Sequence, residues 1–155
     1  MPTLVLVRHS KAEPHRPDDH SRELAPRGRA DAAEVREWLQ RKGIDPSYVV
    51  VSTATRARQT WECCAVGSAP VGYDDRVYEA SVQDLLEVLR ESPAEAGTVV
   101  LVGHNPSVEQ LAWRLDGSDA ARDQTNQGLR TSGVAVFEVA AWKDLSEGRL
   151  VALRG

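Results

Sequence analysis

The chain has 155 residues, of which 41% are apolar and 27% are charged, and its formal net charge is −4. This length and composition are typical of one globular domain, and we expect residues 1–155 to form it. The acidic balance argues against a protein that binds duplex nucleic acid, which usually presents a basic surface, but it leaves room for a small phosphorylated substrate.

No segment resembles a membrane helix or a secretion signal. Apolar runs such as Leu4–Val7 are short, whereas a membrane helix needs about 20 apolar residues, and Arg8 follows too early for the apolar part of a signal peptide. The two cysteines, Cys63 and Cys64, are adjacent, and no Cys or His spacing is typical of a zinc site. We therefore expect a cytoplasmic protein that does not bind a membrane and needs no metal or cofactor.

Short apolar runs occur at intervals along the chain. Continuous apolar runs of this length are typical of strands buried on both faces of a sheet. Those in the first two thirds of the chain are Thr3–Val7, Tyr48–Val51 and Thr98–Val102. Two further runs, Gly133–Val139 and Leu150–Leu153, predict a C-terminal hairpin.

Four apolar stripes with helical spacing lie between these runs or after them. Their members are Ala32, Val35, Trp38 and Leu39; Ala57, Trp61, Cys64 and Ala65; Val82, Leu85, Leu86 and Leu89; and Val108, Leu111, Ala112 and Leu115. Gly43 is expected to end the first helix. Ser81, with Asp84 three residues later, predicts a capping box for the third. Asn105 as N-cap and Pro106 as first helical residue predict the start of the fourth.

The alternation of strands and helices predicts an α/β fold with right-handed crossovers. We expect a single three-layer sandwich, in which helices cover both faces of a mostly parallel central sheet. The stretches Ala12–Glu23 and Asp116–Ser132 are polar and show no clear period, so both are predicted to be loops. His15 and His20, in the first of them, are expected to face solvent.

Ligands of open α/β sheets bind beyond the carboxyl ends of the strands, and polar residues follow each central strand here. They are Arg8, His9, Ser10 and Lys11 after the first, Ser52–Arg56 after the second, and Gly103, His104 and Asn105 after the third. The helix predicted after Asn105 would present its N-terminal N–H groups at the same edge, where they favour an anion.

These residue types suit phosphoryl transfer. A neutral imidazole is a competent nucleophile, and arginine forks match phosphate oxygens. Catalysis then consists mainly of positioning and electrostatic stabilisation, with no metal cluster required. A lone histidine after a strand is more often structural, so the hypothesis depends on the coincidence of Arg8, His9, Arg56 and His104 at one edge.

Four motifs, in order, resemble those of the histidine phosphatase superfamily, which includes the phosphoglycerate mutases. Leu6–Ser10 resembles the R-H-G signature, Leu24–Gly28 the L-T-x-x-G helix opening, Val51–Thr60 the S-x-A-x-R-A-x-Q-T segment, and Gly103–Pro106 the second-histidine motif. The short chain and the G-H-N-P form are most similar to the SixA-like phosphohistidine phosphatases.

The resemblance implies a phosphoglycerate mutase-like fold and a role for each matching residue. His9 would be the phosphorylated nucleophile, while Arg8, Arg56 and His104 would hold the phosphoryl oxygens. Glu79 falls where family members place an acidic proton donor, although an acidic residue before a helix is often simply solvated.

Four further residues are candidates for substrate binding. Arg22 stands where the short subgroup carries an arginine before its leucine. Ser10 replaces the usual glycine of the first motif and could add a hydroxyl contact. Lys11 and Asn105 lie next to the motif histidines, although basic loop residues usually face water.

We expect a metal-independent phosphatase that acts through a phosphohistidine intermediate. Family members that act on bulky small molecules generally carry insertions over the site, and this chain leaves little room for one. Phosphohistidine in a protein is therefore the first substrate class, and a small phosphate monoester is the second. A non-catalytic module that binds phosphate or a phosphoprotein is a third possibility. We expect the protein to be a monomer whose partner is the phosphorylated protein or small molecule.

Overall fold

Six strands form one sheet in the computed structural model, which describes residues 1–14 and 18–155. The prediction for His15 falls outside these residues. The strands are β1 (Thr3–Arg8), β2 (Tyr48–Ser52), β3 (Val71–Asp74), β4 (Thr98–Gly103), β5 (Val134–Glu138) and β6 (Arg149–Arg154). Their order across the sheet is β3-β2-β4-β1-β5-β6.

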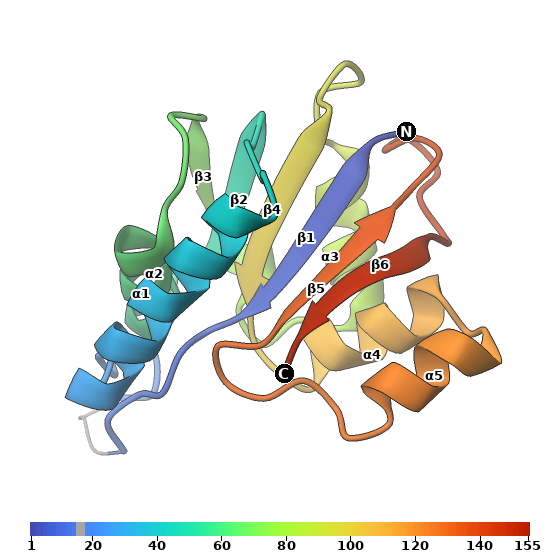
Figure 1. The fold of residues 1–155 in the computed structure, drawn as a ribbon. Helices are drawn as coiled ribbons and strands as arrows, with labels where there is room; N and C mark the ends of the chain where they lie inside the picture. The colour runs from blue at the N-terminus through green and yellow to red at the C-terminus, as the bar shows by residue number, and fades with distance from the viewer. Residues whose placement is uncertain (15–17) are drawn as a thin grey trace.

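The centre of the sheet is parallel, as predicted. β1 pairs parallel with β4, β4 with β2, and β2 with β3. β5 runs antiparallel to β1 and to β6, so the predicted C-terminal hairpin is confirmed. Because β1, β2 and β4 point the same way, their carboxyl ends meet at one edge (Figure 1).

Helices cover both faces of this sheet, which confirms the three-layer sandwich. α1 (Pro26–Arg41) and α2 (Thr55–Cys64) lie on one face, and α3 (Val82–Arg90) and α4 (Ser107–Leu115) lie on the other (Figure 1). The capping box at Ser81 and Asp84 is present at the start of α3. Gly43, just after α1, has a φ of +68°, the conformation for which glycine ends helices.

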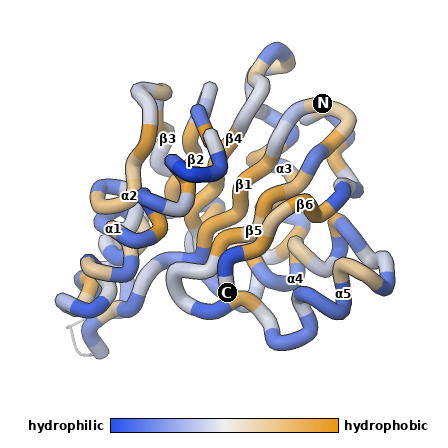
Figure 2. The backbone as a smooth tube through the Cα atoms, in the orientation of Figure 1, coloured by the Kyte–Doolittle hydropathy of each residue, from blue (hydrophilic) through white to orange (hydrophobic). Residues whose placement is uncertain are grey.

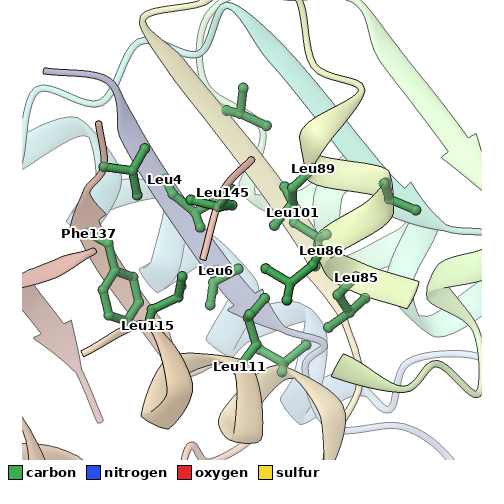
Figure 3. Close-up of a cluster of buried hydrophobic side chains, with 14 of the residues drawn as sticks. Leu4, Leu6, Leu85, Leu86, Leu89, Leu101, Leu111, Leu115, Phe137 and Leu145 are labelled. Atoms are coloured by element: carbon green, nitrogen blue, oxygen red, sulfur yellow. The ribbon is translucent and has the colours of Figure 1, made fainter. Parts of the chain in front are cut away.

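Successive side chains of the central strands belong alternately to two separate hydrophobic clusters. On β1, Leu4 and Leu6 join α3 and α4 in one cluster, whereas Val5 and Val7 join α1 and α2 in the other. Figure 3 shows Leu6 facing Leu86 of α3 and Leu111 of α4. In Figure 2 the strands form the apolar middle of the molecule, and the helices carry polar outer faces. This is why the strands appear in the sequence as unbroken apolar runs.

Two local predictions are wrong. α4 begins at Ser107 with Pro106 as its N-cap, and no side chain caps it. The Asn105 amide instead donates to Glu109 Oε2, one helical turn away, and to the Leu129 carbonyl, which the fold brings near.

The stretch predicted as one long loop, Asp116–Ser132, contains α5 (Asp119–Thr125). Seven residues are too few for a helical period to show, but Ser118 caps the helix through its hydroxyl. Within residues 1–14 and 18–155, no helix is long and apolar enough to cross a membrane.

Candidate active site

The pairing of β1 with β4 brings two histidines together at the carboxyl edge of the sheet. Arg8 lies opposite Gly103 in the register, and the His9 N–H continues the ladder by donating to the Gly103 carbonyl at 3.0 Å. His9 and His104 are therefore the first residues beyond two neighbouring strands. Their ring centroids are 5.1 Å apart.

His9 is held as a neutral ring with one free nitrogen. Its Nδ1 lies 2.7 Å from the Ser10 carbonyl oxygen, which can only accept, so Nδ1 carries the hydrogen and Nε2 the lone pair. Burial, and then the charges of Arg56, Arg8 and Arg22, lower the pKa of His9 to about 4, although the Ser10 carbonyl opposes this shift. A neutral imidazole with a free Nε2 is the form that attacks phosphorus.

His104 is also neutral, and Ser52 orients it. The imidazole is 7% exposed, and its Nε2 lies 2.8 Å from the Ser52 hydroxyl oxygen. That oxygen already accepts from the Ala54 N–H, and Ser52 is fully buried. His104 Nε2 is the one acceptor for the Ser52 hydroxyl hydrogen among the described residues, so that hydrogen goes to Nε2, which leaves the ring hydrogen on Nδ1. Burial first, and then the neighbouring His9, lower the pKa of His104 to about 3.

Two arginines complete the group, each fixed by one end of its guanidinium. Arg8 donates from Nη1 to the Leu129 carbonyl at 3.0 Å. Arg56, from α2, donates from Nη1 and Nη2 to the carbonyl and carboxylate of Asp19. Both guanidinium groups donate through η nitrogens, and the Nε–H of each makes no hydrogen bond to the described residues.

Three buried hydrogen-bond donors at this site are without a partner among residues 1–14 and 18–155. They are Arg8 Nε, Arg56 Nε and His104 Nδ1. A buried donor that bonds to nothing is costly, by about 1–3 kcal/mol, so native proteins rarely keep several in one place. Three of them on residues close to His9 fit an anion with several acceptor oxygens, such as a phosphoryl group.

The other motif residues hold the segments around His9 together. Gly28, in the first turn of α1, packs so closely on Lys11 that a Cβ would lie 2.0 Å from the Lys11 carbonyl oxygen. On α2, Thr60 Oγ1 accepts from the Ser10 N–H at 2.9 Å and donates to the Arg56 carbonyl. The glycine and the threonine of these motifs thus serve to bring α1 and α2 against the loop that follows β1.

The remaining binding candidates take different positions. Ser10 is fully buried, and its hydroxyl lies 2.6 Å from the Ser132 hydroxyl, so it already has a partner inside the protein. Lys11 is exposed. Asn105 uses its amide N–H groups for Glu109 and Leu129, and its Oδ1 is buried with no donor among the described residues.

Arg22 and Glu79 lie at the border of the site. Arg22 donates from Nε to the Glu13 carbonyl and from Nη1 to Asp19, and its charge is close enough to lower the pKa of His9. Glu79 is exposed and has a φ of +53°, a left-handed conformation that non-glycine residues rarely adopt. It follows Tyr78, whose ring lies 5.7 Å from that of His104.

The predicted loop at Ala12–Glu23 supplies residues that the sequence analysis did not assign to the site. Asp19 bonds to Arg56, and its Oδ2 also accepts from the Tyr78 hydroxyl at 2.7 Å. The expectation that His20 faces solvent is wrong. Its Nε2 lies 3.0 Å from Thr53 Oγ1, and its ring packs edge-on against Tyr78 at 4.8 Å. The only sequence signal was the proximity of Asp19 and His20 to Arg22.

The pKa values of His9 and His104 can be followed by NMR titration of their ring C–H signals. We expect midpoints at about pH 4 and 3, because burial disfavours the charged rings. Both shifts also make the free energy of unfolding fall as the pH drops below about 6.5, since the unfolded chain takes up protons more readily. A His9 midpoint near the ordinary value of about 6.5 would contradict the buried, neutral nucleophile.

Comparison with known proteins agrees with this geometry. Residues 4–96 match the family model of the histidine phosphatase superfamily, branch 1. An uncharacterized protein of Mycobacterium tuberculosis is 37% identical over 148 residues, which cover 92% of this chain and 93% of that protein. Two solved SixA structures, described as candidate phosphohistidine phosphatases, are also similar. That of Nakamurella multipartitia is 33% identical, with a TM-score of 0.92 and coverage of 99% and 95%. That of Agrobacterium tumefaciens is 28% identical, with a TM-score of 0.86 and coverage of 99% and 98%.

Proposed function

Because this chain belongs to the histidine phosphatase superfamily, we propose that it is a phosphatase in which His9 accepts the phosphoryl group of the substrate. The observation that carries this proposal is the lone pair on His9 Nε2 near three buried donors that have no partner among residues 1–14 and 18–155. A module that only binds phosphate would have no need of a neutral, oriented nucleophile.

The reaction proceeds in two displacements at phosphorus. The lone pair of His9 Nε2 forms the N–P bond while the bond to the leaving atom breaks, and the leaving atom keeps its electron pair and takes a proton. A water molecule then attacks phosphorus and gives up one proton to solvent, which balances the proton taken up in the first step. The N–P bond breaks, its electron pair returns to Nε2, and inorganic phosphate is released. Arg8, Arg56 and the Nδ1–H of His104 bind the phosphoryl oxygens in both steps. The arginines supply the positive charge in this scheme, and the neutral His104 contributes a hydrogen-bond donor.

Phosphohistidine on a protein is the substrate class that we favour. Two similar structures carry the SixA name and are described as candidate phosphohistidine phosphatases. Imidazole is also a good leaving group once protonated, so its departure depends less on a positioned acid than that of an alkoxide. A small phosphate monoester is the alternative, and the position of Glu79 beside Tyr78 favours it, because an alkoxide leaving group needs a positioned acid.

Glu79→Gln separates the two substrate classes. If Glu79 protonates the leaving atom, kcat/KM for alkyl phosphates should fall by about 10²-fold or more, whereas hydrolysis of phosphohistidine should change little. The strained backbone at Glu79 supports a functional role for this side chain. Glu87→Gln, an exposed carboxylate on α3, is the matched control. Equal losses on both substrates would mean that Glu79 is not the acid.

The test of the proposed function is a comparison of purified substrates in the presence of EDTA. We expect release of inorganic phosphate from a generic aryl phosphate and a higher kcat/KM for phosphohistidine protein than for sugar or nucleotide phosphates. Activity on small esters alone would assign the protein to the second class. Binding of phosphate without turnover on any substrate, or activity that EDTA removes and a divalent metal restores, would overturn the proposal.

A further inference from the structure

Asp19 joins three side chains at the border of the phosphoryl site. Its Oδ2 accepts from Arg56 Nη2 at 3.0 Å and from the Tyr78 hydroxyl at 2.7 Å, and its Oδ1 accepts from Arg22 Nη1 at 2.9 Å. Its backbone carbonyl accepts from Arg56 Nη1 at 2.8 Å. One residue therefore fixes two guanidinium groups and one aromatic ring.

The contacts with Asp19 determine how the Arg56 guanidinium is presented. Both η nitrogens are bound by the same residue, one by its carbonyl and one by its carboxylate, so the plane of the group is set from one side. The buried Nε–H remains without a partner among the described residues. Without Asp19, a guanidinium that is only 6% exposed would have to find new acceptors and would turn away from its present orientation.

Asp19 also keeps Arg22 at the site. Arginine has a long side chain that gains little from a single exposed ion pair, and the side chain of Arg22 is 28% exposed. Two bonds hold it, one to the Glu13 carbonyl and one to Asp19. In this position its charge contributes to the lowered pKa of His9.

The alternative is that the Asp19 carboxylate competes with the phosphoryl group for Arg56 and Arg22, so that the phosphoryl group must displace it. The backbone hydrogen bonds at Asp19 and His20 argue against this displacement, because they fix the segment that carries the carboxylate. The His20 carbonyl accepts from the Thr55 N–H at the start of α2, and the Asp19 carbonyl also accepts from the Arg22 N–H. Backbone bonds at Asp19 and at the residue that follows it thus hold this part of the chain in place.

We propose that Asp19 is a positioning residue that orients Arg56 and holds Arg22 as a third guanidinium for the phosphoryl group. The proposal builds on the phosphatase function proposed above. It also applies to the binding of an anion without turnover, so the two can be tested separately.

Asp19→Asn is the informative change, because an amide has one acceptor oxygen and presents N–H groups to donors in place of the other. It can satisfy Arg22 or Arg56, but not both. We expect the Kd for tungstate, measured by calorimetry, to rise about 10-fold or more, and kcat/KM for an aryl phosphate to fall by about 10–100-fold. Asp18→Asn is the matched control, since it removes the same charge from a neighbouring carboxylate whose hydrogen bonds go to Ser21.

A double-mutant cycle with Arg22→Ala distinguishes positioning from a general loss of structure. If Asp19 acts partly through Arg22, Asp19→Asn should cost less in the Arg22→Ala protein than in the wild type. Additive losses would show that the carboxylate does not act through Arg22. Tighter tungstate binding by Asp19→Asn would show that Asp19 competes with the anion, and an unchanged Kd would show that it is only a surface ion pair. Each of these three results would overturn the proposal. Tungstate binding requires no turnover, so these measurements remain decisive if the phosphatase function itself fails.

Discussion

His9→Ala should abolish hydrolysis of every phosphorylated substrate, with a loss in kcat of at least about 10³-fold. The variant has no Nε2 to form the N–P bond, so the first of the two displacements cannot take place. The fold should survive, because His9 lies beyond the end of β1 and outside both hydrophobic clusters. Steady-state assays and thermal unfolding of the same preparation measure the two effects together.

His20→Ala is the control for this experiment. It removes an imidazole that also packs near the site, against Tyr78, but has no proposed part in the chemistry. We expect it to keep most of the activity. A His9→Ala protein that turns over at a rate close to that of the wild type would refute covalent catalysis by His9.

Arg56→Lys should reduce kcat/KM by roughly an order of magnitude or more, although the charge is kept. A lysine ammonium is a point donor that cannot bond to Asp19 and a phosphoryl oxygen from opposite sides of a planar group. Arg58→Lys, on the same helix, is the matched control. Arg58 is exposed, and its guanidinium carbon lies 4.9 Å from the centroid of the Tyr73 ring.

Comparison of Arg56→Lys with Arg58→Lys tests whether the guanidinium geometry of Arg56 matters for catalysis. If Arg56 and Arg58 show equal, small losses on conversion to lysine, the bidentate geometry at Arg56 has no role in catalysis. If Arg56→Lys loses activity and also unfolds at a much lower temperature, while Arg58→Lys does neither, the ion pair between Arg56 and Asp19 stabilises the fold. We expect the unfolding temperature to change little, because the Asp19 side chain is 49% exposed and an ion pair of this kind contributes little.

The central layout could be predicted from the sequence because it follows from two strong signals. Runs such as Leu4–Val7 and Val99–Val102 are apolar at every position, and only strands covered on both faces have this pattern. Parallel strands end at one edge, so the residues after them must meet there. This places His9 beside His104, and the register of β1 and β4 does so in the structure.

The local details depend on contacts between residues far apart in the sequence, which no local pattern reveals. Asn105 has the chemistry of an N-cap, yet the fold brings the Leu129 carbonyl within reach of its amide, and α4 starts later. Asp19 lies in a polar stretch that looks solvated, but it meets Arg56 of α2 because that helix begins beside it. Short α5 likewise carried too few residues to show a period.

Rapid-quench trapping with a substrate labelled on its phosphoryl group tests covalent catalysis most directly. The account predicts an acid-labile, base-stable adduct on His9 that forms and decays at least as fast as the steady-state turnover. Peptide mapping under alkaline conditions locates the label. Hydrolysis of the substrate with no label on His9 at any quench time, or with the label on another residue, would contradict it.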